Sequence, residues 1–220
     1  MSVLKSAVGR KVIMAVTGFF MVFFVLMHLL GNSTIFIGPE WINSYAEHLH
    51  DLPVVVWPFR GFMFVMLCLH VFFGITLTLE NWGANPGKYA VSKKLKTTFA
   101  GKTMIWTGLL LLAFILFHLL HFTLKVVPEV PQVLDELGRF DVYTMMVAGL
   151  LNRVVAGIYI AAMIVLFLHT SHGIQSIFQT IGLNNERTLP KYNLAAKFLS
   201  AVFLIGFSAI PVLIVTWIIS

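Results

Sequence analysis

Residues 12–30, VIMAVTGFFMVFFVLMHLL, form an apolar run that contains one histidine, His28. A second run, residues 103–120, TMIWTGLLLLAFILFHLL, places a Thr-Gly pair before His118 with the same spacing that separates Thr17-Gly18 from His28. About 20 apolar residues in a helix cross the hydrocarbon core of a bilayer, and an ionisable side chain there is costly and marks a function by default. The two runs therefore predict membrane-spanning helices that carry functional histidines.

Two further histidines share a second repeated pattern, H-x3-G-x8-G. It occurs at His70, followed by Gly74 and Gly83, and again at His169, followed by Gly173 and Gly182. A single histidine in an apolar helix is often only a helix–helix hydrogen-bonding group. Four histidines with matched surroundings favour two pairs of ligands instead.

The composition excludes a soluble domain, because 59% of the 220 residues are apolar, 11% are charged and the mean hydropathy is +0.90. The net charge of +6 lies in particular loops, which argues against nucleic-acid binding. The lone Cys68 provides neither a disulfide framework nor a C-x-x-C-H haem attachment. We predict an all-α integral membrane protein, a single domain over 1–220, with a retained first helix and spans near 12–36, 54–80, 103–126, 143–178 and 195–219.

The loop charges predict the orientation. Eleven of the 15 basic residues flank one set of helix ends, with two acids: Lys5, Arg10, Lys11, Lys88, Lys93, Lys94, Lys96, Lys102, Arg187, Lys191 and Lys197, with Glu80 and Glu186. The other seven acids lie in the opposite loops. By the positive-inside rule the N-terminus is cytoplasmic and the C-terminus lies outside. Helices one–two and three–four then form a parallel repeat and a four-helix bundle, with helix five packed outside it.

Depth along the helices pairs the histidines. His28 lies about 24 Å from the inner end of its helix at 1.5 Å per residue, and His118 is similarly placed, so both lie near the outer face. His70 and His169 lie on helices that run inward, so both belong near the inner face. The two levels are separated by roughly 15–20 Å. Two facing histidines can provide the axial ligands of a haem, so the bundle is predicted to hold two.

Other polar residues give weaker signals. His121 and His172 lie three residues from a predicted ligand and are alternative ligands. Because only His118 and His169 keep the repeat spacing, His121 and His172 are predicted instead to line the site as polar residues or to support the ligands by hydrogen bonding. Arg60 and Arg153 are candidates for pairing with outer haem propionates, and Arg10, Lys11 and Lys102 with inner ones; snorkelling to the interface is the alternative. In the acidic loop, predicted to be solvated, Glu47, His50 and Asp51 are quinone-site candidates, and His48 and His50 are otherwise ordinary loop residues.

The chain resembles the cytochrome b membrane anchors of succinate:quinone oxidoreductases, of the type with one five-helix, di-haem subunit. The resemblance covers nearly the whole chain and rests on these segments: Gly9-Arg10-Lys11, Thr17-Gly18 with His28-Leu29-Leu30-Gly31-Asn32, Asn43-Ser44-Tyr45-Ala46, Leu49-His50-Asp51-Leu52-Pro53, Thr107-Gly108 with His118, and His169 with His172-Gly173-Ile174-Gln175-Ser176 and Phe178-Gln179-Thr180.

This resemblance implies that His28 and His118 bind the outer haem b, and that His70 and His169 bind the inner one. It also implies a bacterial cytoplasmic (inner) membrane protein. Its partners would be an FAD-bearing flavoprotein and an iron–sulfur subunit on the cytoplasmic side, in a complex that can dimerise. The chain would carry electrons between them and membrane quinone, in particular menaquinone, in succinate oxidation or fumarate reduction. Some relatives have a glutamate where Phe167 stands here, so a proton route through that carboxylate is in doubt.

Three other functions compete with this interpretation. The nearest is a di-haem cytochrome b of a hydrogenase or formate dehydrogenase. A membrane di-iron enzyme requires histidine clusters on one face, whereas this chain has only H-x2-H at opposite depths. A metal transporter is disfavoured because the spans lack carboxylates.

Overall fold

The computed structural model describes residues 6–84, 99–127, 130–183 and 185–219. In this part of the chain, five helical spans are long and apolar enough to cross a membrane, and the one β-type pairing is a bridge between Leu134 and Phe140. The predicted basic residues Lys5, Lys88, Lys93, Lys94 and Lys96 lie outside the described ranges, as does the acidic Glu129.

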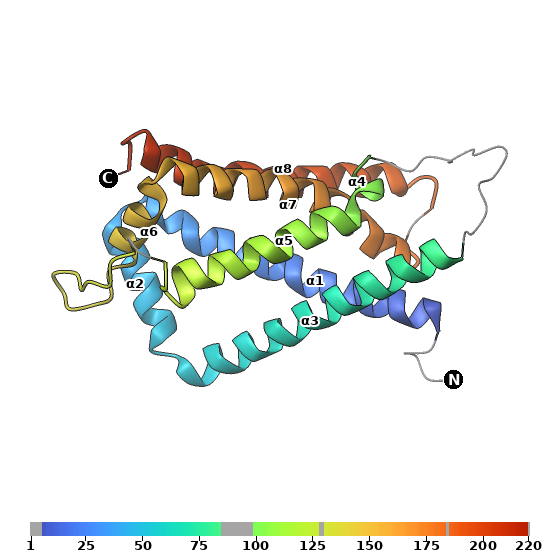
Figure 1. The fold of residues 1–220 in the computed structure, drawn as a ribbon, viewed down its shortest axis with the longest axis horizontal. Coiled ribbons are helices and arrows are strands. Elements are labelled where there is room, and N and C mark those ends of the chain that lie inside the picture. The colour runs from blue at the N-terminus through green and yellow to red at the C-terminus, as the bar shows by residue number, and fades with distance from the viewer. Residues whose placement is uncertain (1–5, 85–98, 128–129, 184, 220) are drawn as a thin grey trace.

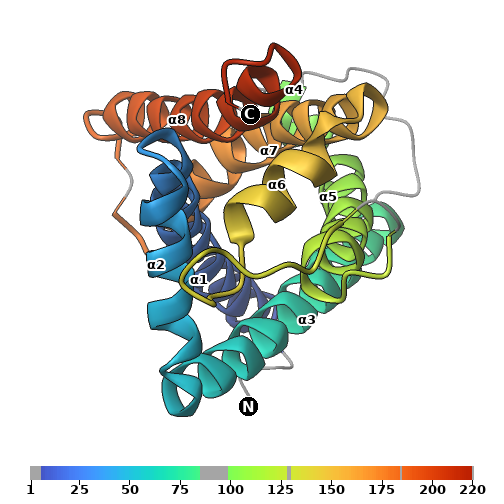
Figure 2. The ribbon, with the colours of Figure 1, turned by 90° about the vertical axis from the view of Figure 1, so that its left-hand side faces the viewer.

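Four long helices form a ring, and consecutive ones run in opposite directions (Figures 1 and 2). They are α1 (Ala7–Asn32), extended by the 3-10 turn η2 (Ser33–Phe36); α3 (Pro53–Gly83); α5 (Met104–His118), extended by the π-helical turn η3 (Leu119–Thr123); and α7 (Arg153–Thr180). α1 and α5 run in one direction and α3 and α7 in the other (Figure 1). The parallel two-helix repeat predicted from the sequence is therefore present in the backbone.

The fifth span, α8 (Leu189–Val215), packs along α7 on the outside of this ring (Figure 2). Buried Thr170 donates a hydrogen bond to Ser200 at 2.7 Å, and Phe203 is fully buried at the contact. Gly206 lets α8 reach α1, because a Cβ there would lie 2.8 Å from Leu29 Cδ1. The helix begins at Leu189 rather than near 195, and Pro190 occupies its first turn, where a missing N–H is harmless.

The described ranges also contain three shorter α-helices: α2 (Pro39–His50), α4 (Phe99–Lys102) and α6 (Val142–Leu151). The prediction of a loop at 37–53 was wrong over α2, which Pro39 begins directly after Gly38 at a positive φ of 133°. The prediction of one helix over 143–178 was also wrong. At Asn152 the backbone is extended (ψ 116°), and its side chain accepts hydrogen bonds from the amides of Val154 and Val155. Asparagine is a strong N-cap and a poor interior residue, so a new helix begins there.

α2 and α6 close the same end of the ring (Figure 1). Their buried apolar side chains form one cluster with the ends of α1 and α8: Ile35, Ile42, Val130, Met145, Met146, Leu150, Ile210 and Ile214. We call this the α2/α6 end. The opposite end, where α1 begins, is called the α4 end. The four histidines of the repeats, His28, His70, His118 and His169, lie in the ring between these two ends.

Candidate functional site: two histidine pairs and a pocket at the α2/α6 end

The pair nearer the α4 end consists of His70 on α3 and His169 on α7, which lie on diagonally opposite helices of the ring. Their ring centroids are 6.3 Å apart, with an interplanar angle of 69°. Each histidine is half-buried. The two rings thus face each other across the bundle axis.

Both rings of this pair are held by a threonine from the neighbouring helix. Thr17 Oγ1 lies 3.1 Å from His70 Nδ1, and Thr107 Oγ1 lies 3.1 Å from His169 Nδ1. Each hydroxyl donates its proton within its own helix, Thr17 to the carbonyl of Ile13 and Thr107 to that of Met104. The hydroxyls therefore accept from the imidazole Nδ1–H, which leaves the Nε2 lone pair of each ring free to bind a metal.

The glycines of the Thr-Gly pairs make room for the same rings. A Cβ at Gly18 would lie 3.4 Å from His70 Cε1, and one at Gly108 would lie 3.3 Å from His169 Cε1. The Thr-Gly pair thus contacts the histidine of the other level, not the histidine of its own helix. The spacing contains this signal, because eleven residues of helix span about 16 Å, which is the separation expected between the two levels.

The second pair, nearer the α2/α6 end, consists of His28 on α1 and His118 on α5. Their centroids are 5.9 Å apart, with an interplanar angle of 84°. His28 stacks on Phe24 at 5.4 Å, and Phe207 of α8 lies 5.9 Å from it. Depth along the helices therefore brings together the same pairs that the sequence predicts.

The two alternative histidines occupy different surroundings. His121 is 1% exposed and its Nδ1 lies 2.9 Å from the hydroxyl of Tyr159. His172 is half-buried, and its ring lies against Gly101 of α4, where a Cβ would meet Cε1 at 3.0 Å. His121 thus contacts Tyr159, and His172 contacts Gly101. The histidine on each facing helix is paired instead with the ring that keeps the repeat spacing.

The donor sets fit haem. Two imidazoles that share one metal ion at about 2 Å per bond place their centroids about 6 Å apart, as both pairs do. Each pair would provide one imidazole nitrogen from each of two facing helices, a donor set that suits haem. In the described ranges, no group of three or more His, Cys, Asp or Glu side chains is arranged to hold a metal ion.

An open pocket of 210 Å³ lies at the α2/α6 end, lined by Ala46, Glu47, His50, Arg139 and Phe140. Two of the three quinone-site candidates, Glu47 and His50, therefore lie together. His50 Nδ1 is 2.7 Å from the carbonyl of Ala46. The third candidate, Asp51, follows α2 as an exposed C-cap and does not line this pocket.

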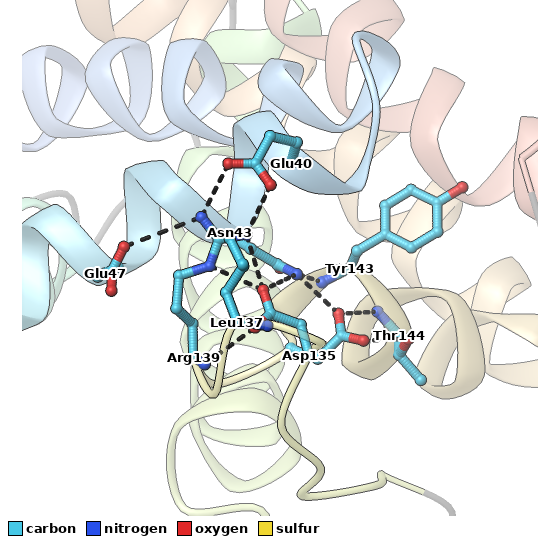
Figure 3. A network of polar contacts seen from close by, with 9 residues as sticks. Glu40, Asn43, Glu47, Asp135, Leu137, Arg139, Tyr143 and Thr144 are labelled. Carbon is cyan, nitrogen blue, oxygen red and sulfur yellow. Dashed lines mark hydrogen bonds and ion pairs between the residues drawn. The ribbon is translucent and has the colours of Figure 1, made fainter.

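Arg139 is the centre of a polar network between α2 and the 131–141 segment (Figure 3). Its guanidinium donates to both oxygens of Glu40 at 2.9 and 2.7 Å and to Asp135 at 2.8 Å, and lies 3.9 Å from Glu47. The hydrogen bonds from Arg139 hold the pKa of Glu40 below its usual range. Burial raises the pKa of Asp135, but hydrogen bonds from the backbone and side chain of Arg139 and from the Leu137 amide outweigh it and lower the pKa.

Asn43 extends this network into the protein. Its side chain is 2% exposed, donates to Asp141 at 3.0 Å and accepts from the amide of Tyr143 at 3.0 Å. Asp141 in turn caps α6 through the amide and hydroxyl of Thr144. Burial raises the pKa of Asp141, but its hydrogen bonds with Thr144 and Asn43 outweigh this and lower it. Within the motif Asn43-Ser44-Tyr45-Ala46, Asn43 thus anchors the helix that carries Glu47 and His50.

The cationic candidates lie at the two ends of the ring. Arg60 is exposed near the start of α3 and stacks over Trp57 at 5.2 Å, and Arg153 is exposed at the first residue of α7. At the α4 end, Arg10 donates to Glu80 at 2.7 Å. Lys102 lines a second pocket of 370 Å³ with Trp82 and Trp106 among others.

The fold defines the class: this chain is an all-α integral membrane protein. Residues 92–208, more than half of the chain, match the succinate dehydrogenase/fumarate reductase transmembrane subunit family, and the chain belongs to that family. It is therefore a membrane subunit of the succinate dehydrogenase/fumarate reductase type. No curated protein and no solved structure matches the chain.

Proposed function

We propose that this subunit is a di-haem cytochrome b that carries electrons between a membrane quinone, in particular menaquinone, and the iron–sulfur and flavin subunits of its complex. The observation that carries the proposal is the presence of two facing histidine pairs at two levels of one bundle, with centroid spacings of 5.9 and 6.3 Å. His28 and His118 would hold the outer haem, and His70 and His169 would hold the inner one. A haem with two protein ligands transfers single electrons and has no open position for a substrate.

The orientation of the chain follows from charge. Arg10, Lys11, Lys102, Arg187, Lys191 and Lys197 gather at the α4 end, and the predicted acidic residues Glu40, Glu47, Asp51, Asp135, Glu136 and Asp141 belong to the other. The positive-inside rule makes the α4 end cytoplasmic, with the C-terminus outside, in a bacterial inner membrane. The iron–sulfur subunit, and through it the FAD-bearing subunit, would dock at the α4 end.

Quinone chemistry belongs at the α2/α6 end, in the pocket lined by Glu47 and His50. Oxidation of a quinol releases two protons with its two electrons, so a base must lie within hydrogen-bonding reach. Glu47 is the first acceptor in this proposal, and His50 the second. The Arg139 guanidinium lies 3.9 Å from Glu47 in the wall of the same pocket. Asp51 lies outside the pocket lining and is the weakest of the three candidates.

Haem propionates need cationic partners near each level. Arg60 and Arg153 lie close to the outer level, at the starts of α3 and α7, and Arg10 and Lys102 lie at the inner end. Arg10 already pairs with Glu80, so a propionate would compete with that carboxylate. Lys102 is exposed and lines the inner pocket, which makes it the more available cation there.

The test is haem content in the purified complex. The reduced-minus-oxidised spectrum should have a b-type α band, and the pyridine haemochrome should give two haems per subunit. His28→Ala and His70→Ala should each lose one haem and keep the other. His48→Ala is the matched control, because His48 is exposed on α2 and outside both pairs. Full haem content in both ligand variants would overturn the assignment. Separately, assays of fumarate reduction and succinate oxidation by the wild-type complex would establish the direction of the reaction.

A further inference from the structure

Tyr159 of α7 lies between two histidines at the outer level. Its hydroxyl is 3.3 Å from Nδ1 of His118 and 2.9 Å from Nδ1 of His121. The ring is itself fixed by aromatic contacts with Phe114 at 5.1 Å and Phe117 at 6.0 Å. One hydroxyl therefore contacts the proposed haem ligand and its close neighbour in sequence at once.

The fold holds His121 in place for this contact. His118 is the last residue of α5, and the π-helical turn that follows, closed by the bond from Leu124 N to Leu119 O at 2.8 Å, carries His121. The His121 ring is buried and stacks on Phe122 with centroids 4.1 Å apart. On its other side, a Cβ at Gly149 would come within 3.1 Å of Nε2. His121 thus has little freedom to turn away from Tyr159.

A phenol has one proton to donate and lone pairs to accept with. The contact with His121 is the shorter of the two, 2.9 Å against 3.3 Å, which favours Nδ1 of His121 as the acceptor of the Tyr159 proton. The Tyr159 oxygen then accepts the Nδ1–H of His118. A neutral imidazole that is protonated at Nδ1 has its lone pair on Nε2, which is the form that binds iron.

The inner level uses the same arrangement with a different acceptor. There, the hydroxyls of Thr17 and Thr107 donate their protons to main-chain carbonyls, which can only accept. The same two hydroxyl oxygens therefore accept hydrogen bonds from His70 and His169. At the outer level the hydroxyl proton goes to a second imidazole, which can exist in two tautomers. The direction of the outer hydrogen bond therefore depends on His121.

We infer that Tyr159 and His121 are positioning residues for His118: His121 takes the Tyr159 proton, and Tyr159 in turn holds His118 in the tautomer that ligates the outer haem. The inference rests on the proposed haem ligation and adds a role that the repeat does not predict, since His121 lacks the repeat spacing. The proposed hydrogen bonds form one chain, in which His118 Nδ1–H donates to the Tyr159 hydroxyl and that hydroxyl donates to His121 Nδ1.

The test uses three variants in the whole complex. In Tyr159→Phe the acceptor is removed while the ring contacts remain. In His121→Leu the Tyr159 proton is released and can turn toward His118, which opposes ligation. In His121→Asn the amide oxygen replaces Nδ1 as the acceptor, so the chain is retained. Loss of such an outer partner weakens metal binding by roughly 10- to 100-fold, and this loss is expected for Tyr159→Phe and His121→Leu.

The readouts are haem content, the midpoint potential of the outer haem, and its low-spin electron paramagnetic resonance signal, which responds to imidazole hydrogen bonding. We expect Tyr159→Phe and His121→Leu to change the outer signal and potential, His121→Asn to restore them, and the inner signal to stay constant in all three. An outer signal unchanged in Tyr159→Phe and His121→Leu would overturn the inference, as would an equal change in His121→Asn. A wild-type complex without b-type haem would instead overturn the proposed function.

Discussion

The hydroxyls of Thr17 and Thr107 provide the sharpest test of how the inner histidines are oriented. Thr17 is 1% exposed and Thr107 is 5% exposed, so water cannot replace either hydroxyl as the partner of a ring nitrogen. Substitution by valine keeps the shape and removes the acceptor 3.1 Å from Nδ1 of His70 or His169. A buried N–H left without a partner costs about 1–3 kcal/mol. This agrees with the roughly 10- to 100-fold loss of metal affinity that follows loss of an outer-shell partner.

The assay is best made in a His28→Ala background, in which the proposed ligation leaves only the inner haem. Thr17→Val and Thr107→Val should each lower haem retention during purification and change the midpoint potential and the low-spin resonance of that haem. Thr76→Val is the matched control, because the Thr76 hydroxyl donates to the carbonyl of Phe72 in its own helix and, among the described residues, bonds to no histidine. Retention and potential equal to those of Thr76→Val would refute the reasoning.

Three further predictions concern the α2/α6 end. Glu47→Gln should slow quinol oxidation while leaving both haems reducible by dithionite, and Glu136→Gln, an exposed residue outside the pocket, should not; equal rates in the two variants would contradict the role of Glu47. Asn43→Leu breaks the bonds to Asp141 and Tyr143 and should destabilise this end by about 2–3 kcal/mol, measured by thermal unfolding of the complex; unaltered unfolding would remove Asn43 from the network. The pKa values of Glu40 and Asp135 are lower in the folded protein than in the unfolded chain, where they lie near 4. The two carboxylates therefore add to the free energy of unfolding above about pH 4, and this contribution is lost as the pH falls through the pKa values of the folded protein. The difference in unfolding temperature between wild type and Arg139→Gln should therefore hold from about pH 8 to 5 and narrow below about pH 4, and a constant difference down to pH 3 would contradict the linkage.

The membrane spans and the histidine pairs could be predicted from the chain alone because both depend on local periodicity and on distance along a helix. His28 and His118 are matched in depth, and a helix rises by a fixed amount per residue. The break at Asn152 was missed because the apolar composition continues through it. The N-cap residue Asn152 is a local signal for the break, and the packing of α6 against the ends of α1 and α8 adds the tertiary contacts that hold the turn.

The amphipathic segment after α1 was missed for a similar reason. Residues 39–50 are polar enough to resemble a loop, and their helix is stabilised by tertiary contacts of Ile42 and Asn43. The 131–141 segment that meets it is about 90 residues away in the chain. No local pattern connects Arg139 with Glu40, so the walls of the pocket could not be predicted from sequence.

By itself the sequence determined the class of protein, the number of spans and which histidines lie at the same depth, because hydropathy and the helical rise are properties of a single segment. The tertiary structure alone decided what each Thr-Gly pair does. Contact across neighbouring helices assigns Thr17 to His70 and Thr107 to His169, one level away from the histidine of their own motif. It also separated His121 from His118, since a hydrogen bond to Tyr159 depends on where α7 passes and not on spacing along α5. Side-chain partners between helices are set by packing, and packing is a property of the assembled bundle.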